Sequence, residues 1–154
     1  PVLRAAHPAE AEEDAYLKDA NGRIIRRANQ QNIGRKHFQR LNGNRASHPE
    51  DGYNFRGRGL IQITGYEKYS NFMIDYKMLW AGTAPDTVNN PDNINEMPTA
   101  IQSAIWYWLV YKVYDAERGG GLVDVEKVTK RINGGTMGLD ERKEAYKTAE
   151  RALQ

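Results

Sequence analysis

The sequence predicts a mainly α-helical domain with at most a small β element. Two long segments, residues 66–76 and 98–113, repeat apolar side chains with the spacing of a helix. Glycine, proline and asparagine gather between the helical segments, as in residues 42–59. The alternation of apolar and polar residues that is typical of a half-buried strand is confined to residues 60–64.

The first third of the chain is expected to be helical on both sides of a turn. Residues 9–18 carry acidic side chains near their start, which favours the N-terminus of a helix. Asn21 and Gly22 form a typical turn dipeptide. Residues 23–41 place apolar side chains about one helical turn apart, and basic side chains lie between them. We therefore predict one or two basic amphipathic helices over 23–41.

The central part of the chain combines a loop with an unusual motif. Residues 42–59 are predicted to be a loop, and the motif FRGRGLIQITG occupies residues 55–65. Gly57 and Gly59 lack a Cβ, so the backbone there can approach a polymer or the core of the protein itself. Residues 60–64 read as a short β-like run, followed by a helix from residue 66.

The C-terminal part is predicted to hold the main helices. The strongest helix prediction covers 98–113, which is apolar on most sides and therefore expected to be central and buried. The glycine run 119–121 reads as a linker. Asp124 is expected to cap the next helix, which Gly134 and Gly135 end, and Asp140 is expected to cap the last one.

Composition excludes several classes of site. The chain has 154 residues, which suits one domain over residues 1–154, and it has no cysteine. Disulfides, thiol nucleophiles and cysteine-ligated metals are therefore excluded. The three histidines share no metal-like spacing, so we expect no metal site. No apolar run approaches the ~18 residues that a membrane span needs.

The net charge is small, but basic residues cluster in one segment. Lys and Arg total 22 against 20 Asp and Glu, which gives +2 and is too mild to indicate nucleic acid. Residues 18–45 nevertheless hold eight basic side chains and one acidic side chain. A basic face can attract nucleic acid, a cell-wall glycan or membrane headgroups, although a solvated helix face explains it equally. Interleaved aromatics, typical of single-strand binders, are missing, so no nucleic-acid partner is expected.

Four segments together resemble a known family. They are FRGRGLIQITG (55–65), NPD (90–92), AIQSAIWYW (100–108) and the C-terminal stretch from INGG to Tyr146. In this order they resemble the lysozyme-like glycoside hydrolase family 19, which includes plant-type chitinases and bacterial and phage endolysins. The resemblance covers about residues 29–154 and implies a lysozyme-like α-helical domain. Plant chitinases normally carry disulfides, so the chain is more similar to the endolysin branch.

The resemblance implies roles for several polar residues. It implies that Thr64 helps to hold the nucleophilic water and that Gln62 lines the cleft. It also implies that Asn133 contacts an N-acetyl sugar and that Arg142 joins the polar network of the cleft. Tyr53 can stack on a sugar ring. The alternative is structural, with the glycines forming turns and Asn133 and Arg142 bonding backbone, and for Arg142 both interpretations stay open.

The two catalytic carboxyls are harder to place. Inverting glycosidases need an acid and a base about 6.5–9.5 Å apart, and in the resembled family both are Glu. The family spacing, counted back from FRGRG, puts one near or just before residue 1 and the other further upstream. We therefore expect the domain to lack its N-terminal catalytic segment. Weaker candidates are Glu10, Glu12 or Glu13 as the acid, and Glu50 or Glu67 as the base.

The expected function is hydrolysis of peptidoglycan glycan strands at β-1,4 bonds with inversion, and it needs no cofactor. The expected partner is peptidoglycan or a chitin-like glycan, with an immunity protein as a further partner for an antibacterial effector. We expect a monomer that is secreted or delivered to the bacterial periplasm or cell wall. Two alternatives remain open: a chitinase acting on N-acetylglucosamine polymers, and a glycan-binding module without catalysis.

Overall fold

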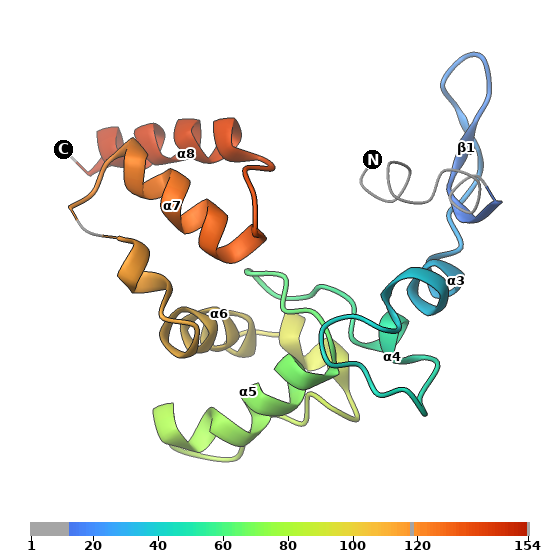
Figure 1. Cartoon of the computed structure of the whole chain (residues 1–154), viewed down its shortest axis with the longest axis horizontal. Coiled ribbons are helices and arrows are strands. Elements are labelled where there is room, and N and C mark those ends of the chain that lie inside the picture. Colours follow the sequence, from blue (N-terminus) through green and yellow to red (C-terminus); the bar gives the residue numbers. More distant parts are fainter. Residues whose placement is uncertain (1–12, 118, 154) are drawn as a thin grey trace. The chain divides into compact units, whose positions relative to one another are not determined.

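The structure is a computed structural model that describes residues 13–117 and 119–153 (Figure 1). The chain falls into two compact units, Pro1–Ser103 and Ala104–Gln154. The boundary between them lies within helix α6 (Thr99–Val110).

In the described part of the first unit, a short antiparallel hairpin follows the helical residues 13–14. Strand β1 (Leu17–Lys18) pairs with strand β2 (Ile24–Arg26). The carboxylate of Asp19 accepts hydrogen bonds from the backbone N–H groups of Asn21 and Arg23, at 2.9 Å each. This carboxylate therefore closes the turn around the Asn-Gly dipeptide. We call residues 16–27 the cationic hairpin.

This hairpin corrects two predictions. Residues 17–18 and 24–26 are strands, so the helix predicted over 9–18 does not reach residue 18. The helix predicted over 23–41 starts only at Gln30. The physical reason is the Asn-Gly turn, whose backbone suits a hairpin and brings the flanking residues together as strands. Residues 13–14 are helical, as predicted, and residues 9–12 lie outside the described residues.

Three short helices follow and pack closely. They are α3 (Gln30–Ile33), the π-helix η1 (Gly34–Phe38) and α4 (Asp51–Asn54). Helix α4 lies in the segment that the sequence predicts as a loop. Two glycines allow this packing, because a Cβ on Gly34 would lie 2.7 Å from Tyr53, and one on Gly52 would lie 2.2 Å from the Gly34 carbonyl oxygen.

A buried ion pair anchors α4. Asp51 is 1% exposed and accepts hydrogen bonds from Arg45 Nε and Nη2 at 2.8 Å each. The Arg45 guanidinium also lies 3.9 Å from the centroid of the Tyr66 ring. Burial raises the pKa of the Asp51 carboxyl, but the hydrogen bonds from Arg45 outweigh it and leave this pKa below its ordinary value.

Helix α5 (Tyr66–Leu79) confirms the helix predicted from residue 66. The sequence predicts that Tyr69, Phe72, Met73 and Tyr76 share one side of this helix. All of them except Met73 are buried. The 3-10 helix η2 (Pro91–Asn95) adds the fully buried Ile94. With Phe55 and Ile63 these side chains form the core of the first unit.

Helix α6 confirms the helix predicted over 98–113, although it ends at Val110, but it is not buried on most sides as expected. Its buried positions are Ala100, Ser103 and Trp106. Ile101, Ile105 and Leu109 are 43–45% exposed. The burial follows the i, i+3, i+6 row that carries the large Trp106 indole.

The second unit ends in a helical hairpin. After η3 (Val113–Ala116), helices α7 (Leu122–Asn133) and α8 (Leu139–Ala152) pack against each other (Figure 1). Gly134 ends α7 in the left-handed conformation, as predicted. The N-caps, however, are Gly121 and Gly138, and the aspartates expected there lie in the first turns. Asp124 still supports the N-terminus of α7, because its carboxylate accepts from Gly120 N–H at 2.9 Å.

Helices dominate the described residues, and their only sheet is the two-stranded cationic hairpin. The mainly α class predicted from the sequence is thus confirmed, and the architecture is consistent with a lysozyme-like fold. No helix within 13–117 or 119–153 combines the length and the apolar composition that crossing a membrane requires.

Candidate functional site

The FRGRGLIQITG motif folds into a tight hairpin. Backbone hydrogen bonds join Arg58 and Ile63 in both directions, at 3.2 and 2.9 Å. The four-residue loop between them has positive φ at Gly59 (70°) and at Gln62 (57°). The β-like run predicted over 60–64 is therefore reduced to one bridge, because the chain reverses inside it. We call residues 58–63 the arginine hairpin.

A buried guanidinium fastens the arginine hairpin. Arg58 is 5% exposed, and its Nε donates to Asp92 Oδ1 at 2.6 Å. Its Nη1 donates to the Asn54 carbonyl oxygen at 2.5 Å and contacts Tyr69 Oη at 3.2 Å. Because these partners come from three separate segments, Arg58 joins α4, α5 and η2 to the hairpin.

The 3-10 helix η2 also supports the turn of the arginine hairpin. Gly59 N–H donates to Asn95 Oδ1 at 3.1 Å. A Cβ on Gly59 would lie 2.8 Å from Ile94 Cγ2, so only glycine fits against the core at this position. The NPD and FRGRG segments are thus one structural unit, although more than 30 residues separate Arg58 from Asp92.

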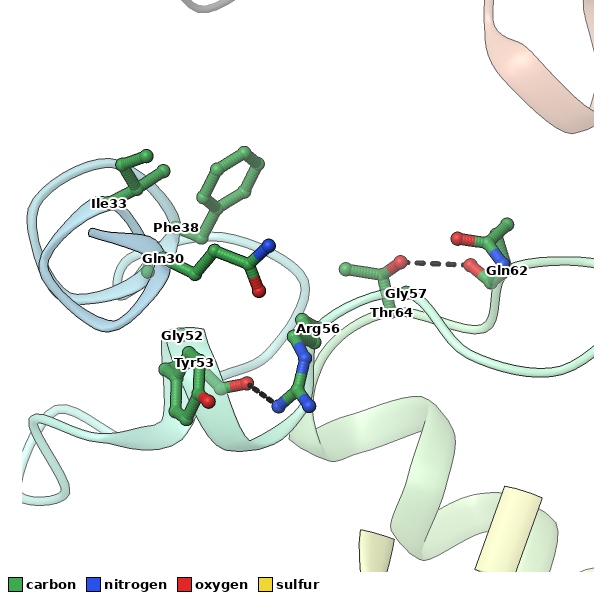
Figure 2. A pocket seen from close by; sticks show the side chains of 10 residues that line it. Gln30, Ile33, Phe38, Gly52, Tyr53, Arg56, Gly57, Gln62 and Thr64 are labelled. Atoms are coloured by element: carbon green, nitrogen blue, oxygen red, sulfur yellow. Dashed lines mark hydrogen bonds between the residues drawn. The ribbon is translucent and has the colours of Figure 1, made fainter. Parts of the chain in front are cut away.

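Gly57 faces the other way and creates a small notch. A Cβ on Gly57 would lie 2.7 Å from Gln62 Oε1 and 3.3 Å from Thr64 Oγ1. The two oxygens therefore converge on the space above Gly57. The Thr64 hydroxyl donates to the Gln62 carbonyl oxygen at 2.8 Å (Figure 2). Gln62 Nε2 donates to the Gly59 carbonyl oxygen at 3.2 Å. These bonds use the Thr64 proton and one Gln62 N–H group, and both Thr64 Oγ1 and Gln62 Oε1 stay available as acceptors.

The notch opens into a cavity of about 350 Å³. Figure 2 shows Gln30, Ile33 and Phe38 on one side of this cavity, with Gln62 and Thr64 on the other. Between them, the Arg56 guanidinium lies 4.5 Å from the centroid of the Tyr53 ring and donates to the Tyr53 carbonyl oxygen at 3.1 Å. The lining therefore offers apolar surface, one aromatic ring and a few polar groups, which is typical of a ligand site.

A second cavity adjoins the first. It measures about 640 Å³ and shares Gln30 and Tyr53 with the first cavity. Its other lining residues are Tyr16, Ile24, Arg27, Ala28, Asn29 and Gln31. We call the two cavities together the groove. Among the described residues, the charged side chains that line it are Arg27 and Arg56, and no carboxylate does.

The structure brings three predicted site residues together. Thr64, Gln62 and Tyr53 all line the first cavity. Asn133 and Arg142 lie in the second unit, where both bond the same backbone segment. Asn133 Nδ2 donates to the Met137 carbonyl oxygen at 3.4 Å, and Arg142 Nη1 donates to it at 2.7 Å. Both residues therefore make the bonds to backbone that the structural alternative predicts.

Arg142 has a second environment besides these backbone bonds. It lines a cavity of about 210 Å³ inside the second unit, next to Asp124 and the aromatic rings of Trp108 and Tyr146. Trp106 is fully buried, as expected of a core residue, whereas Trp108 is half-buried and lines this cavity.

The described candidate carboxylates Glu13, Glu50 and Glu67 are not among the groove-lining residues, although Glu50 bonds Gln31, which is. Glu10 and Glu12 fall outside the described residues. Glu13 is exposed and pairs with Lys36 at 3.2 Å. Glu50 accepts a hydrogen bond from Gln31 at 3.0 Å and is paired with Arg35, whose hydrogen bond lowers the pKa of the Glu50 carboxyl. Glu67 is exposed in the first turn of α5.

Sequence reasoning missed most of the groove lining, and Arg56, Gln30 and Phe38 are examples. Arg56 was read only as part of the motif, although its position directly before Gly57 was a usable signal. Gln30 and Phe38 carry no local signal, because they lie in a segment predicted as a regular amphipathic helix. The expectation that Gly57 and Gly59 allow close approach is confirmed, with Gly59 facing the core and Gly57 facing the groove.

Comparison with known proteins finds a similar curated protein. No family model matches the chain. A glycosyl hydrolase family 19 domain-containing protein of Haemophilus influenzae is 38% identical to the chain over 105 residues. The aligned part is 68% of this chain and 46% of that protein, so the chain spans about half the length of the relative it matches. The chain is thus similar to part of a protein that carries a glycosyl hydrolase family 19 domain.

Proposed function

We propose that the chain is an endolysin-type domain that binds a peptidoglycan glycan strand in the groove and takes part in cutting its β-1,4 bonds. The observation that carries this proposal is the convergence of Gln62 Oε1 and Thr64 Oγ1 on the space above Gly57. Two acceptors at one point suit a water molecule or a sugar N–H or O–H group. The Tyr53 ring and Phe38 supply the apolar surface on which sugar rings stack.

In the proposed mechanism the notch orients the attacking water. Thr64 donates its proton to the Gln62 carbonyl, so Thr64 Oγ1, beside Gln62 Oε1, can accept one hydrogen of the water, and the second hydrogen stays directed at the base. A lone pair of the water oxygen then points toward the sugar carbon under attack. Direct attack by this water inverts the configuration at that carbon, provided that a carboxylate removes the proton and a carboxylic acid protonates the leaving oxygen.

The general acid is proposed among the acidic residues near the start of the chain. The candidates are Glu10, Glu12 and Glu13. Within the described residues no carboxylate lines the groove, so neither the acid nor the base is assigned to a groove residue. Replacing each candidate by Gln, one at a time, tests it, because Gln keeps the shape of the side chain and removes its proton chemistry.

The charge of the groove favours peptidoglycan over chitin. Arg27 and Arg56 line it, and both remain partly or fully exposed, although Asp92 Oδ1 lies 4.0 Å from Arg56 Nη2. Peptidoglycan strands carry carboxylates, whereas chitin is neutral, so an arginine-lined groove without a described acidic side chain suits the anionic polymer. A domain acting on this polymer works in the periplasm or cell wall, where we also place it.

The decisive experiment compares two polymers and two readouts. The chain is incubated with purified peptidoglycan and with chitin oligosaccharides, and new reducing ends are counted. With a longer natural chain that supplies the acid and the base, we expect reducing ends from peptidoglycan, and NMR should show the product first released in the inverted anomeric form. Thr64→Val is expected to lower this rate at least tenfold, since it keeps the side-chain shape and loses the acceptor oxygen.

Three results would change the conclusion. Release from chitin alone would replace peptidoglycan by a neutral glycan. Release of peptide fragments without new reducing ends would overturn the glycosidase proposal. Binding of peptidoglycan without release, both here and in a longer natural chain, would favour the second candidate, a glycan-binding module. The absence of a described carboxylate from the groove lining is the observation that favours this candidate.

A further inference from the structure

The cationic hairpin exposes several large apolar side chains at once. Leu17, Ile24 and Ile25 are 46%, 55% and 59% exposed, and Tyr16 is 48% exposed. They lie on a two-stranded sheet, which cannot bury both of its faces by itself. Single exposed apolar residues are normal, but four in one short hairpin mark an interaction surface.

The same hairpin is strongly basic. Residues 16–27 contain four basic side chains, Lys18, Arg23, Arg26 and Arg27, and one acidic side chain, Asp19. The carboxylate of Asp19 is already bonded to two backbone N–H groups of the turn. The nearest acidic residue before the hairpin, Asp14, is 3% exposed and hydrogen-bonded to Lys36 at 2.9 Å. Glu13 also pairs with Lys36, at 3.2 Å, and Glu10 and Glu12 lie outside the described residues. The two described carboxylates just before the hairpin are therefore engaged by Lys36.

We propose that the cationic hairpin binds the surface of an anionic lipid bilayer. Its apolar side chains would enter the boundary between headgroups and acyl chains, while its lysine and arginines meet the lipid phosphates. The combination selects this partner. A soluble anionic polymer would engage the cations alone and leave Leu17 and Ile25 in water, whereas a bilayer satisfies both kinds of side chain.

Part of the cationic hairpin lies outside the glycan groove. Leu17, Lys18, Arg23 and Ile25 are outside the groove lining, whereas Tyr16, Ile24 and Arg27 contribute to it. Substitutions at the first four residues therefore test lipid binding without touching the proposed glycan site. Each cation near an anionic membrane is expected to contribute about fivefold to affinity, and this contribution should weaken with salt.

The experiment is vesicle co-sedimentation of the full chain. Vesicles of phosphatidylcholine mixed with phosphatidylglycerol are compared with vesicles of phosphatidylcholine alone. We expect binding to the mixed vesicles only, at low salt and weaker at physiological salt. Leu17→Ser with Ile25→Ser, and Lys18→Gln with Arg23→Gln, are each expected to lower this binding at least tenfold.

A matched control comes from α5. Ile74 and Met78 are 67% and 80% exposed, and Lys77 lies between them. Ile74→Ser with Met78→Ser, and Lys77→Gln, should leave vesicle binding unchanged. An equal loss in these controls, equal binding to neutral vesicles, or binding of soluble polyglutamate without any binding of vesicles would each overturn the proposal. Circular dichroism spectra that match those of the unaltered chain show that each variant is folded.

Discussion

The arginine hairpin and the cationic hairpin both reverse the chain, but they are held by different means. The cationic hairpin has two paired strands, yet its side chains are exposed. The arginine hairpin has a single bridge, yet a buried guanidinium ties it to α4, α5 and η2. Strand pairing is therefore a poor guide to how firmly a hairpin is fixed, and contacts of the side chains with distant segments are the better guide.

The strongest way to break this contrast is to remove the guanidinium. Arg58→Met leaves the carbonyl oxygens of Asn54 and Arg56 without their buried donor, and Asp92 without its partner. We expect a loss of about 3 kcal/mol in the free energy of unfolding. Urea unfolding measures it. Arg23→Met in the cationic hairpin is the control and should change stability by no more than about 0.5 kcal/mol. Equal effects of the two substitutions would remove the contrast.

The second test concerns the ion pair that anchors α4. Asp51→Asn leaves Arg45 without its partner and should cost about 2 kcal/mol at neutral pH. The folded-state pKa of Asp51 is lowered, so the stabilisation is fully present above the unfolded carboxyl pKa, about 4. It is lost as the pH falls through the lower folded pKa. Unfolding measured from neutral to acidic pH should show this loss in the unaltered chain and a smaller one in Asp51→Asn.

The third test fills the notch. Gly57→Ala places a methyl group 2.7 Å from Gln62 Oε1, in the space where a ligand atom is proposed. Since the Gln62 side chain can give way, stability should change by less than about 1 kcal/mol. Peptidoglycan binding should weaken about tenfold, which corresponds to about 1.4 kcal/mol. Gly135→Ala is the control, because nothing lies within 4 Å of its added Cβ. Unaltered binding by Gly57→Ala would argue against a ligand in the notch.

The smallest effects are expected at Gln62, where backbone strain and glycan binding can be measured separately. Gln62 has φ of 57°, which costs a residue with a Cβ about 1 kcal/mol that glycine does not pay. Gln62→Gly should therefore hold stability constant or raise it slightly, although it loses the bond from Nε2 to the Gly59 carbonyl oxygen. Glycan binding should fall severalfold, and a pull-down with insoluble peptidoglycan measures this for both the Gly57 and the Gln62 variants. A variant that is less stable yet binds normally would give Gln62 a purely structural role.

The long helices and the groove residues of the FRGRG motif could be predicted because their signals are local. Helices α5 and α6 show helical spacing over three turns or more, and Thr64 and Gln62 lie inside one continuous motif. The burial of Arg58 could not be predicted, because arginine usually lies at the surface and its partner Asp92 is 34 residues away.

The start of the chain was predicted less well for a related reason. The Asn-Gly turn was recognised, but the helical spacing that follows it was extended too far back. Sequence periodicity gives no boundary, and the carboxylate of Asp19, which closes the turn, gives no periodic signal. The pairing of Asn133 and Arg142 with the Met137 carbonyl was open from the sequence, since both amide and guanidinium groups bond backbone as readily as ligands.

The two glycines of the FRGRG motif also decide whether this element can be transplanted. Gly57 makes room toward the groove, and Gly59 makes room toward Ile94 in η2. A protein engineer who grafts residues 55–65 onto another scaffold would carry the notch but leave behind Asp92, Ile94 and Asn95, which hold it in shape. The portable unit is therefore discontinuous: the motif and the 3-10 helix have to move together.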